Sequence, residues 1–283
     1  MNQAMTTRNQ HFDWGSRTYL MGILNVTPDS FSDGGEFSTV ESAVIQAQRM
    51  VKAGVDMIDI GGQSTRPGAE TVPTEEELSR VIPVIEAIRS AAQPLSQIPI
   101  SVDTTRAVVA EAAVSAGADW VNDISAATFD SEMLSTVARL KVPIVLMHIR
   151  GTPKTMQTLT DYSDLMVDIA QFLTERVVAS QQAGIDRSHI ILDPGIGFAK
   201  TYQQNITILQ QLPQLCALGY PLLVGVSRKS FIGHLLNQPD AKLRVWGTAA
   251  ACTAAIAKGA DILRVHDVEQ MYDVCRVADG IYR

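Results

Sequence analysis

The sequence AGVD at residues 53–56 recurs as AGAD at 116–119, AGID at 183–186 and KGAD at 258–261. Each copy follows a segment with helical periodicity and precedes a short apolar run. A glycine just past a helix can adopt the left-handed conformation that ends the helix, so each copy predicts a helix-to-strand turn. The recurrence indicates a structural unit, a helix followed by a strand, that is repeated along the chain.

Eight short segments rich in aliphatic residues are predicted strands. Most are nearly continuous apolar runs, which is typical of parallel strands with both faces covered. Helical periodicity lies between them, for example at residues 40–51 and 165–173. The predicted strands are residues 20–25, 57–60, 98–103, 120–124, 142–148, 190–193, 222–227 and 262–266.

Eight strand-then-helix units of about 30 residues each account for residues 19–283 and predict an α/β fold, a single-domain (β/α)8 TIM barrel. Residues 1–18 are predicted to be an N-terminal extension. A doubly wound open sheet is the alternative. That fold usually carries a glycine-rich phosphate turn, and no GxGxxG motif follows any predicted strand.

The composition is that of an ordinary globular protein, with 46% hydrophobic and 19% charged residues among 283. The net charge of -7 argues against binding to nucleic acid or to an anionic membrane surface. No apolar run reaches the roughly 18 residues of a membrane-spanning helix, and residues 1–14 are polar, without the apolar stretch of a signal peptide. We therefore expect a cytoplasmic protein. Its three cysteines are far apart and indicate neither a disulfide framework nor a zinc site.

Polar side chains occur at the carboxyl end of the predicted strands. In a closed barrel these ends meet at one mouth, which is where barrel enzymes place their chemistry. The alternative for each residue alone is that it caps backbone groups or begins a loop. The strand-end residues are Asn25, Asp59, Asp103, Asn122, Asp123, His148, Asp193, Ser227, Arg264 and His266.

The predicted mouth combines acceptors with cationic donors. Asp103, Asn122 and Asp193 are suited to a flat heterocycle that presents adjacent N–H donors. Residues 227–230 leave a strand and enter a short helix, whose exposed N–H groups attract anions. For Arg264 the alternative is a surface ion pair, whereas for His148 a structural role is favoured over a ligand role. Donors suited to phosphate are Arg66, Lys229, Arg264 and His266.

Two long segments, residues 21–35 and 59–68, closely resemble the two signature segments of the dihydropteroate synthases. The resemblance continues through shorter motifs and covers residues from about 19 to the C-terminus. Two positions depart from the family pattern. Gln63 stands where glutamate is expected, and Ala199 where a further glycine is usual.

The resemblance implies a transferase of folate biosynthesis. Such an enzyme joins 6-hydroxymethyl-7,8-dihydropterin pyrophosphate to para-aminobenzoate and releases 7,8-dihydropteroate and pyrophosphate. Pyrophosphate is a good leaving group once its charge is neutralised, so a dissociative substitution needs no protein nucleophile. The resemblance also implies Mg2+ bound through Asn25, with Asp33 orienting its shell, and a homodimer formed through barrel helices.

The resemblance assigns each substrate to a set of residues. The pterin is expected to be bound by Asp103, Asn122, Ile124, Met147, Asp193 and Lys229. The pyrophosphate is expected to be bound by Asn25, Arg66, Arg264 and His266. Para-aminobenzoate, and sulfonamides that mimic it, are expected to be bound by Phe31, Thr65, Pro67, Phe198 and Ser227. The residues expected to act in catalysis are Asn25, Asp33, Arg66, Lys229, Arg264 and His266.

Two other functions remain open at this stage. One is a pterin-recognising barrel that transfers a methyl group from a folate to a corrinoid protein, although that function does not need the long loop at residues 25–35 or the pair formed by Arg264 and His266. The other is a non-catalytic pterin-binding protein, which the retained cationic residues argue against.

Overall fold

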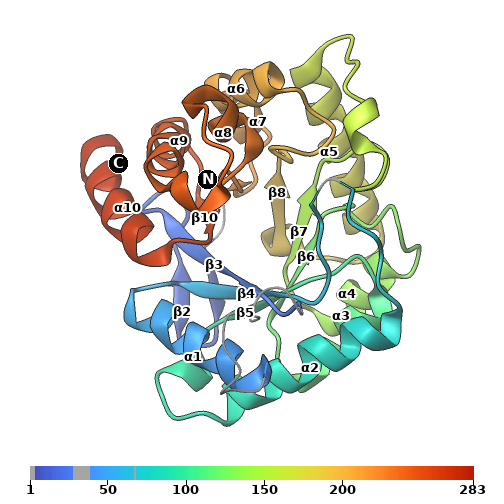
Figure 1. Cartoon of the computed structure of the whole chain (residues 1–283). Coiled ribbons are helices and arrows are strands. Elements are labelled where there is room, and N and C mark those ends of the chain that lie inside the picture. The colour runs from blue at the N-terminus through green and yellow to red at the C-terminus, as the bar shows by residue number, and fades with distance from the viewer. Residues whose placement is uncertain (1–3, 28–38, 67) are drawn as a thin grey trace.

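A computed structural model describes residues 4–27, 39–66 and 68–283 of the chain, and eight parallel strands form its centre. The strands are β3 (Tyr19–Asn25), β4 (Met57–Gly61), β5 (Ile100–Asp103), β6 (Trp120–Asp123), β7 (Ile144–Met147), β8 (Ile190–Asp193), β9 (Leu223–Val224) and β10 (Ile262–Val265). Their order in the sheet is β8-β7-β6-β5-β4-β3-β10-β9. A bridge between Leu192 and Leu222 closes the ring between β8 and β9. The predicted single-domain TIM barrel is confirmed (Figure 1).

Helices surround the barrel and bury their apolar faces against it (Figure 1). The α-helices are α1 (Thr39–Lys52), α2 (Thr74–Ser90), α3 (Ala107–Ala116), α4 (Met133–Leu140), α5 (Leu165–Gln182), α6 (Tyr202–Gln210), α7 (Pro213–Cys216), α8 (Ser230–Leu236), α9 (Val245–Ala257) and α10 (Val268–Tyr282). Short 3-10 helices are η2 (Leu95–Gln97), η3 (Met156–Thr158), η4 (Arg187–His189) and η5 (Ala241–Leu243). Within the described ranges, no helix is both long and apolar enough to cross a membrane.

The repeated glycines make the predicted turns between helices and strands. All four have positive φ angles, a region that side-chain-bearing residues enter only at a cost. The φ values are 89° at Gly54, 117° at Gly117, 97° at Gly184 and 98° at Gly259.

The aspartate that ends each repeat has a separate role, which the pattern alone does not show. In three copies its carboxylate accepts the backbone N–H of a residue within one position of the start of the neighbouring strand. Each hydrogen bond therefore links a helix-to-strand turn to the preceding strand of the barrel. The pairs are Asp56 with Leu20 at 2.8 Å, Asp119 with Ile100 at 2.9 Å and Asp261 with Leu222 at 3.0 Å.

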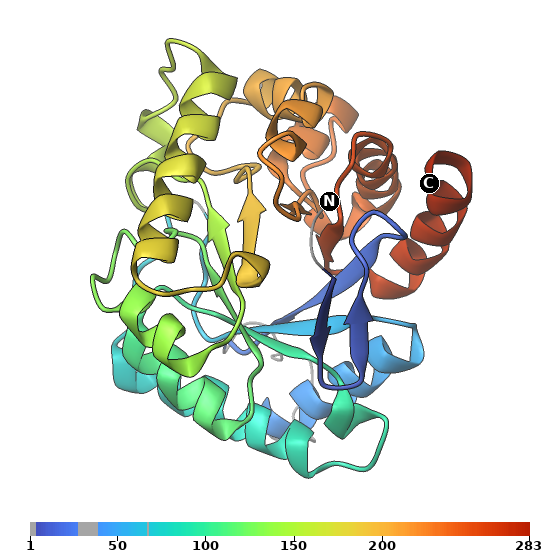
Figure 2. The ribbon, with the colours of Figure 1, turned by 180° about the vertical axis from the view of Figure 1, so that it is seen from behind.

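The N-terminal segment forms a hairpin of β1 (Met5–Thr7) and β2 (Gln10–Phe12), which lies across the amino-terminal end of the barrel (Figure 2). Phe12 is fully buried there, with its ring centroid 5.3 Å from that of Trp120. Arg8, in the hairpin turn, donates to the Asp119 carboxylate at 2.6 Å. This segment covers the end opposite the predicted mouth.

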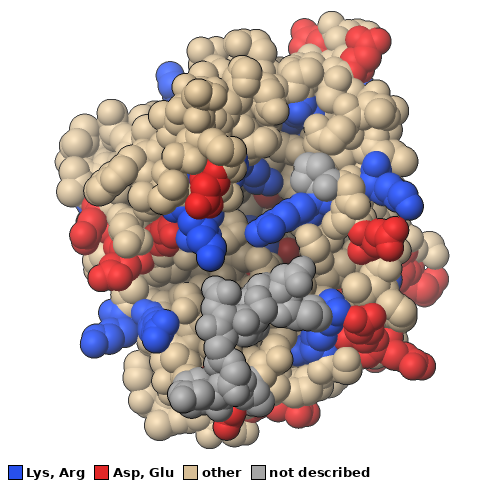
Figure 3. All heavy atoms as spheres, in the orientation of Figure 1, with Lys and Arg blue, Asp and Glu red and all other residues tan. Residues whose placement is uncertain are grey.

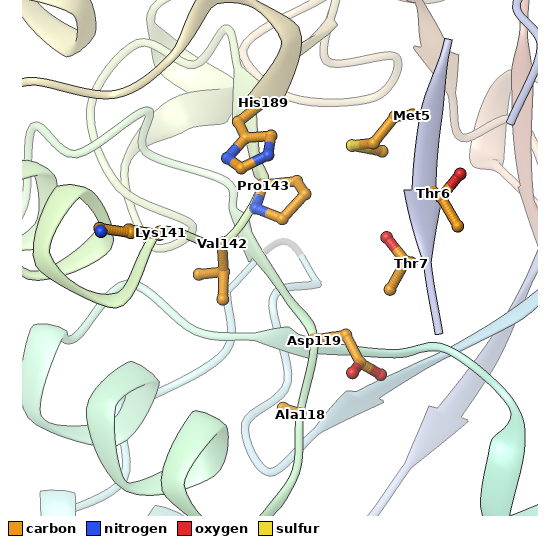
Figure 4. Close-up of a pocket in the computed structure, with 9 residues that line it drawn as sticks. All are labelled: Met5, Thr6, Thr7, Ala118, Asp119, Lys141, Val142, Pro143 and His189. Atoms are coloured by element: carbon orange, nitrogen blue, oxygen red, sulfur yellow. The ribbon is translucent and has the colours of Figure 1, made fainter. Parts of the chain in front are cut away.

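A cavity of about 210 Å³ lies beside this hairpin (Figure 4). None of the predicted site residues lines it, so it is separate from the predicted mouth. Its lining residues are Met5, Thr6, Thr7, Ala118, Asp119, Lys141, Val142, Pro143 and His189.

One strand is much shorter than predicted. Residues 222–227 were expected to form it, but β9 spans only Leu223 and Val224. Beyond Val224 the chain leaves the ladder, and the Ser227 hydroxyl accepts the backbone N–H of His266 at 3.1 Å. A side chain thus replaces the backbone acceptor that a longer strand would have supplied.

Candidate active site

The carboxyl ends of the strands meet at one face of the barrel, which faces the viewer in Figure 1. Figure 3 shows this face hollowed near its centre, with lysine and arginine side chains around the hollow. The predicted acidic residues line the interior below them, because they lie on strands whose side chains alternate between the barrel interior and the helices.

Arg264, on β10, forms a buried ion-pair network with carboxylates from two other strands. Its Nε donates to Asp59 at 2.6 Å and its Nη2 to Asp103 at 2.6 Å. The Asn122 amide donates to the same Asp59 oxygen at 3.0 Å. Burial raises the pKa of Asp103, and the charge of Arg264 opposes this effect. The network brings together two predicted pterin residues and one predicted pyrophosphate residue.

Asp193 and Lys229 face one another across the mouth with opposite charges. Burial raises the pKa of Asp193 to about 6, partly offset by the N–H of Gly195 and by the Lys229 ammonium group. Burial lowers the pKa of Lys229 to about 8, partly offset by Asp193. Gly195 donates to the Asp193 Oδ1 at 2.7 Å, which leaves the second carboxylate oxygen available for a ligand.

His266 is oriented by Ser227, and burial together with nearby cations favours its neutral form. Its Nδ1 lies 3.0 Å from the Ser227 hydroxyl, which also accepts the His266 backbone N–H. Burial lowers the pKa of His266 to about 3, and the nearby charges of Arg228, Arg264, Arg66 and Lys229 lower it further. If the Ser227 hydroxyl donates to Nδ1, the ring proton is on Nε2, where it can be donated to an anion.

An apolar cluster forms the other wall of the mouth. Phe198 is 8% exposed, and its ring centroid lies 4.4 Å from the Lys229 Nζ, a cation–π contact. The predicted ring contacts Ile124 and Met147 belong to the same cluster. The complete cluster is Ile124, Met147, Ile149, Met156, Phe198 and Ala199.

The remaining predicted residues lie at the rim or outside the described residues. Asn25 ends β3 and is half-buried, Thr65 is half-buried in the loop after β4, and Arg66 is exposed in the same loop. Predictions for Phe31, Asp33 and Pro67 concern positions outside the described residues. The departure Gln63 is half-buried in the loop after β4.

Two charged residues in the mouth were not assigned to any substrate: Asp59, which was predicted only as a strand-end residue, and Lys200, which was not predicted. Asp59 is fully buried and holds both Arg264 and Asn122. In the sequence, the sign of this role was a carboxylate within an apolar strand. Lys200 is 3% exposed, and its Nζ lies 3.0 Å from the Nδ1 of His148, which gives that histidine a buried structural contact. Nothing in the sequence around Lys200 indicates that it is buried.

Asn122 and Asp123, adjacent residues at the end of β6, have different roles in the structure. Asn122 points into the mouth, where it binds Asp59. The Asp123 carboxylate instead accepts the N–H groups of Ser125 at 2.7 Å and Ala127 at 2.8 Å, so it organises the following loop. Alternation along the strand explains the difference. The mouth as a whole offers acceptors beside fixed cations and suits a ligand with a donor-rich ring and an anionic group.

Comparison with known proteins shows the family to which this chain belongs. Residues 21–266 match the pterin-binding enzyme family. The chain belongs to this family. Among the pterin-binding enzymes, the dihydropteroate synthase of Synechocystis sp. is 63% identical over 272 residues, which cover 96% of this chain and 93% of that relative. The predicted resemblance to dihydropteroate synthases is thereby confirmed.

Solved structures of pterin-binding enzymes agree with the fold of this chain. The Xanthomonas albilineans dihydropteroate synthase with 4-aminobenzoic acid has a TM-score of 0.87 and 46% identity, covering 94% of this chain and 93% of that one. The enzyme of the same organism in complex with 7,8-dihydropteroate has a TM-score of 0.88 and 42% identity, covering 99% and 98%.

Proposed function

We propose that the protein is a dihydropteroate synthase that works at the carboxyl-terminal mouth of its barrel. It joins the methylene carbon of 6-hydroxymethyl-7,8-dihydropterin pyrophosphate to the amine of para-aminobenzoate. The observation that carries this proposal is the convergence of Asp103, Asn122, Asp193, Lys229 and Arg264 in one mouth. The similarity to enzymes of this name supports it.

The buried acceptors would hold the pterin through its N–H groups. The free oxygen of Asp193 accepts from the donor-rich edge, and the Lys229 ammonium group donates to the ring oxygen. Asp103 uses one oxygen for Arg264 and offers the other to the ligand. Ile124 and Met147 pack against the ring from the apolar wall.

The cationic rim would stabilise the leaving pyrophosphate. As the carbon–oxygen bond breaks, negative charge moves onto the diphosphate, where Arg66, Arg264 and the Nε2–H of neutral His266 can stabilise it. The pterin ring delocalises the positive charge left on the methylene carbon. The arylamine nitrogen then attacks that carbon and afterwards loses a proton. No side chain has to form a covalent bond with the substrate.

The mouth also suits one Mg2+ ion held largely by the substrate. The described residues contain no group of three or more histidine, cysteine or acidic side chains able to hold a metal. Mg2+ keeps most of its waters, so the Asn25 amide oxygen and the diphosphate oxygens would be a fitting ligand set. The bound ion would neutralise charge on the diphosphate.

A homodimer is proposed through the outer face of α8, η5, α9 and α10. Apolar side chains are exposed there in unusual number, and Trp246 is 76% exposed. Such a face is typical of a protein interface. The exposed residues are Leu235, Leu236, Leu243, Trp246, Val277, Ile281 and Tyr282.

A direct assay tests the proposed function. The protein is incubated with the pterin pyrophosphate, para-aminobenzoate and Mg2+, and pyrophosphate and dihydropteroate are measured together. We expect both products in equal amounts. Pterin binding without turnover would favour the non-catalytic alternative. Methyl transfer in a separate incubation with a methylated folate and a corrinoid protein would favour the other. The cytoplasmic location stays a prediction from the sequence.

A further inference from the structure

The loop after β8 has an unusual backbone at the apolar wall of the mouth. Within five residues, Gly195, Gly197 and Ala199 have φ angles of 70°, 86° and 51°. Glycine adopts such angles readily, but for Ala199 the left-handed conformation is unfavourable and persists only where surrounding contacts hold it. Phe198 lies within this run, so its ring position depends on those contacts.

Side chains bind three consecutive carbonyl groups of this loop. The Gln157 amide donates to the carbonyl of Gly197 at 3.3 Å. The Lys200 ammonium group donates to that of Phe198 at 2.9 Å. The Tyr162 hydroxyl donates to that of Ala199 at 2.9 Å. Two of these donors come from one segment, residues 150–164 after β7, which we call the β7 strap.

The β7 strap is itself fixed at both ends. The Arg150 guanidinium group lies 3.7 Å from the ring centroid of Tyr162 and donates to Asp168 of α5 at 2.7 Å. In the middle of the strap, Met156 is fully buried in the apolar cluster that contains Phe198. The strap therefore holds the Phe198 loop from outside the mouth.

The β7 strap also contacts the opposite side of the predicted arylamine site. The Pro153 carbonyl accepts the backbone N–H of Gly68 at 3.0 Å. Gly68 lies three residues after Thr65, which the proposed function places against the arylamine. One segment thus contacts two of the loops that carry predicted arylamine residues.

We propose that the β7 strap, through Tyr162 and Gln157, positions Phe198 and thereby sets the affinity for the arylamine substrate. Tyr162 and Gln157 are positioning residues, since they bind the loop carbonyls rather than substrate. This inference rests on the proposed placement of para-aminobenzoate at Phe198. The pterin contacts Asp103 and Asn122 lie on other strands and do not depend on the strap.

Tyr162→Phe tests the proposal because it removes only the hydroxyl and keeps the ring that packs on Arg150. Loss of one hydrogen bond predicts a rise in KM for para-aminobenzoate of roughly threefold to tenfold. We expect a smaller rise in KM for the pterin pyrophosphate, because only two of its proposed contacts, Asp193 and Lys229, touch this loop. Gln157→Ala, at an exposed position, should act in the same direction. Tyr202→Phe, at an exposed tyrosine on the neighbouring α6, is the matched control and should change neither KM.

A double-mutant cycle with Phe198→Ala separates this proposal from the proposed function. Phe198→Ala should raise KM for para-aminobenzoate, and Tyr162→Phe should add little in that background because it acts through Phe198. If Phe198→Ala leaves this KM unchanged, the placement of the arylamine is wrong. If Phe198→Ala raises it but Tyr162→Phe does not, only the strap proposal is overturned. Equal effects of Tyr162→Phe on both KM values, or in both backgrounds, would also overturn it.

Discussion

At the scale of single residues, Asp193 and Lys229 have pKa values displaced towards each other by burial, to about 6 and about 8. The proposed pterin contacts require Asp193 to be ionised and Lys229 to be protonated. Asp193 gains a proton as the pH falls through 6, and Lys229 loses one as the pH rises through 8. The affinity for pterin is therefore expected to be highest between these two values.

Calorimetry with a pterin that lacks the diphosphate, between about pH 5 and pH 9, measures this dependence. Lys229→Met should lower the affinity roughly 10- to 100-fold and remove the alkaline decline, because the titrating donor is lost. Asp193→Asn should reduce the acidic decline instead, and the part that remains is expected from Asp103, whose pKa burial also raises. An alkaline decline that persists unchanged in Lys229→Met would assign it to another group.

Ala199 has a backbone conformation that is unfavourable for a residue with a side chain. It is fully buried, and its φ of 51° lies in the left-handed region. Ala199→Gly relieves about 1–2 kcal/mol of this strain but loses a buried methyl group and adds disorder to the unfolded chain. We expect these contributions to cancel within about 1 kcal/mol.

Ala110→Gly is the matched control, since Ala110 is equally buried but lies inside helix α3. It loses the same methyl group without relief of strain, so we expect destabilisation by about 1–2 kcal/mol. Denaturant unfolding of both variants measures the difference. Equal losses of stability would show that Ala199 is not strained.

At the scale of elements, the four repeats are alike in sequence but differ in what their aspartates bind. Asp261 is 7% exposed and accepts the buried N–H of Leu222. Asp186 is exposed and accepts the backbone N–H and the hydroxyl of Ser188, in η4. Asp261→Ala leaves a buried donor without a partner, whereas Asp186→Ala leaves one that water can reach.

We therefore expect Asp261→Ala to lower the free energy of unfolding by about 1–3 kcal/mol and Asp186→Ala by less than about 1 kcal/mol. Asp261→Asn keeps an acceptor oxygen and should fall between them. Chemical denaturation followed by circular dichroism gives these values. A larger loss for Asp186→Ala than for Asp261→Ala would refute the role assigned to the buried aspartates.

At the scale of the whole molecule, the apolar face around Trp246 determines the expected assembly. A charge at its centre would have to be buried without a partner on dimer formation, which is costly. Trp246→Glu should therefore convert a dimer of the wild-type protein into a monomer. Light scattering after size-exclusion chromatography measures the mass. Val178→Glu, at a 47% exposed position on α5, is the control and should remain dimeric. A wild-type monomer would contradict the proposed homodimer.

Much of the fold could be predicted from the sequence because its signals are local. Glycine at a helix end determines a turn wherever it occurs, and an apolar run between such turns forms a buried strand. The length of the strand after residue 222 was not predictable in this way, because it depends on the competition between backbone pairing and the hydroxyl of Ser227. The burial of Lys200 likewise depends on its contacts with His148, just after β7, and with the Phe198 carbonyl, which the fold brings together.

The barrel, the family and most of the polar residues at the mouth follow from the sequence, since strand direction alone places strand ends on one face. Which of those residues touch depends on how the strands pack together. Arg264 binds Asp59 across 205 residues of chain and Asp103 across 161, and no local pattern relates them. Ring closure and the register between parallel strands set these contacts, because they determine which side chains share a level inside the barrel.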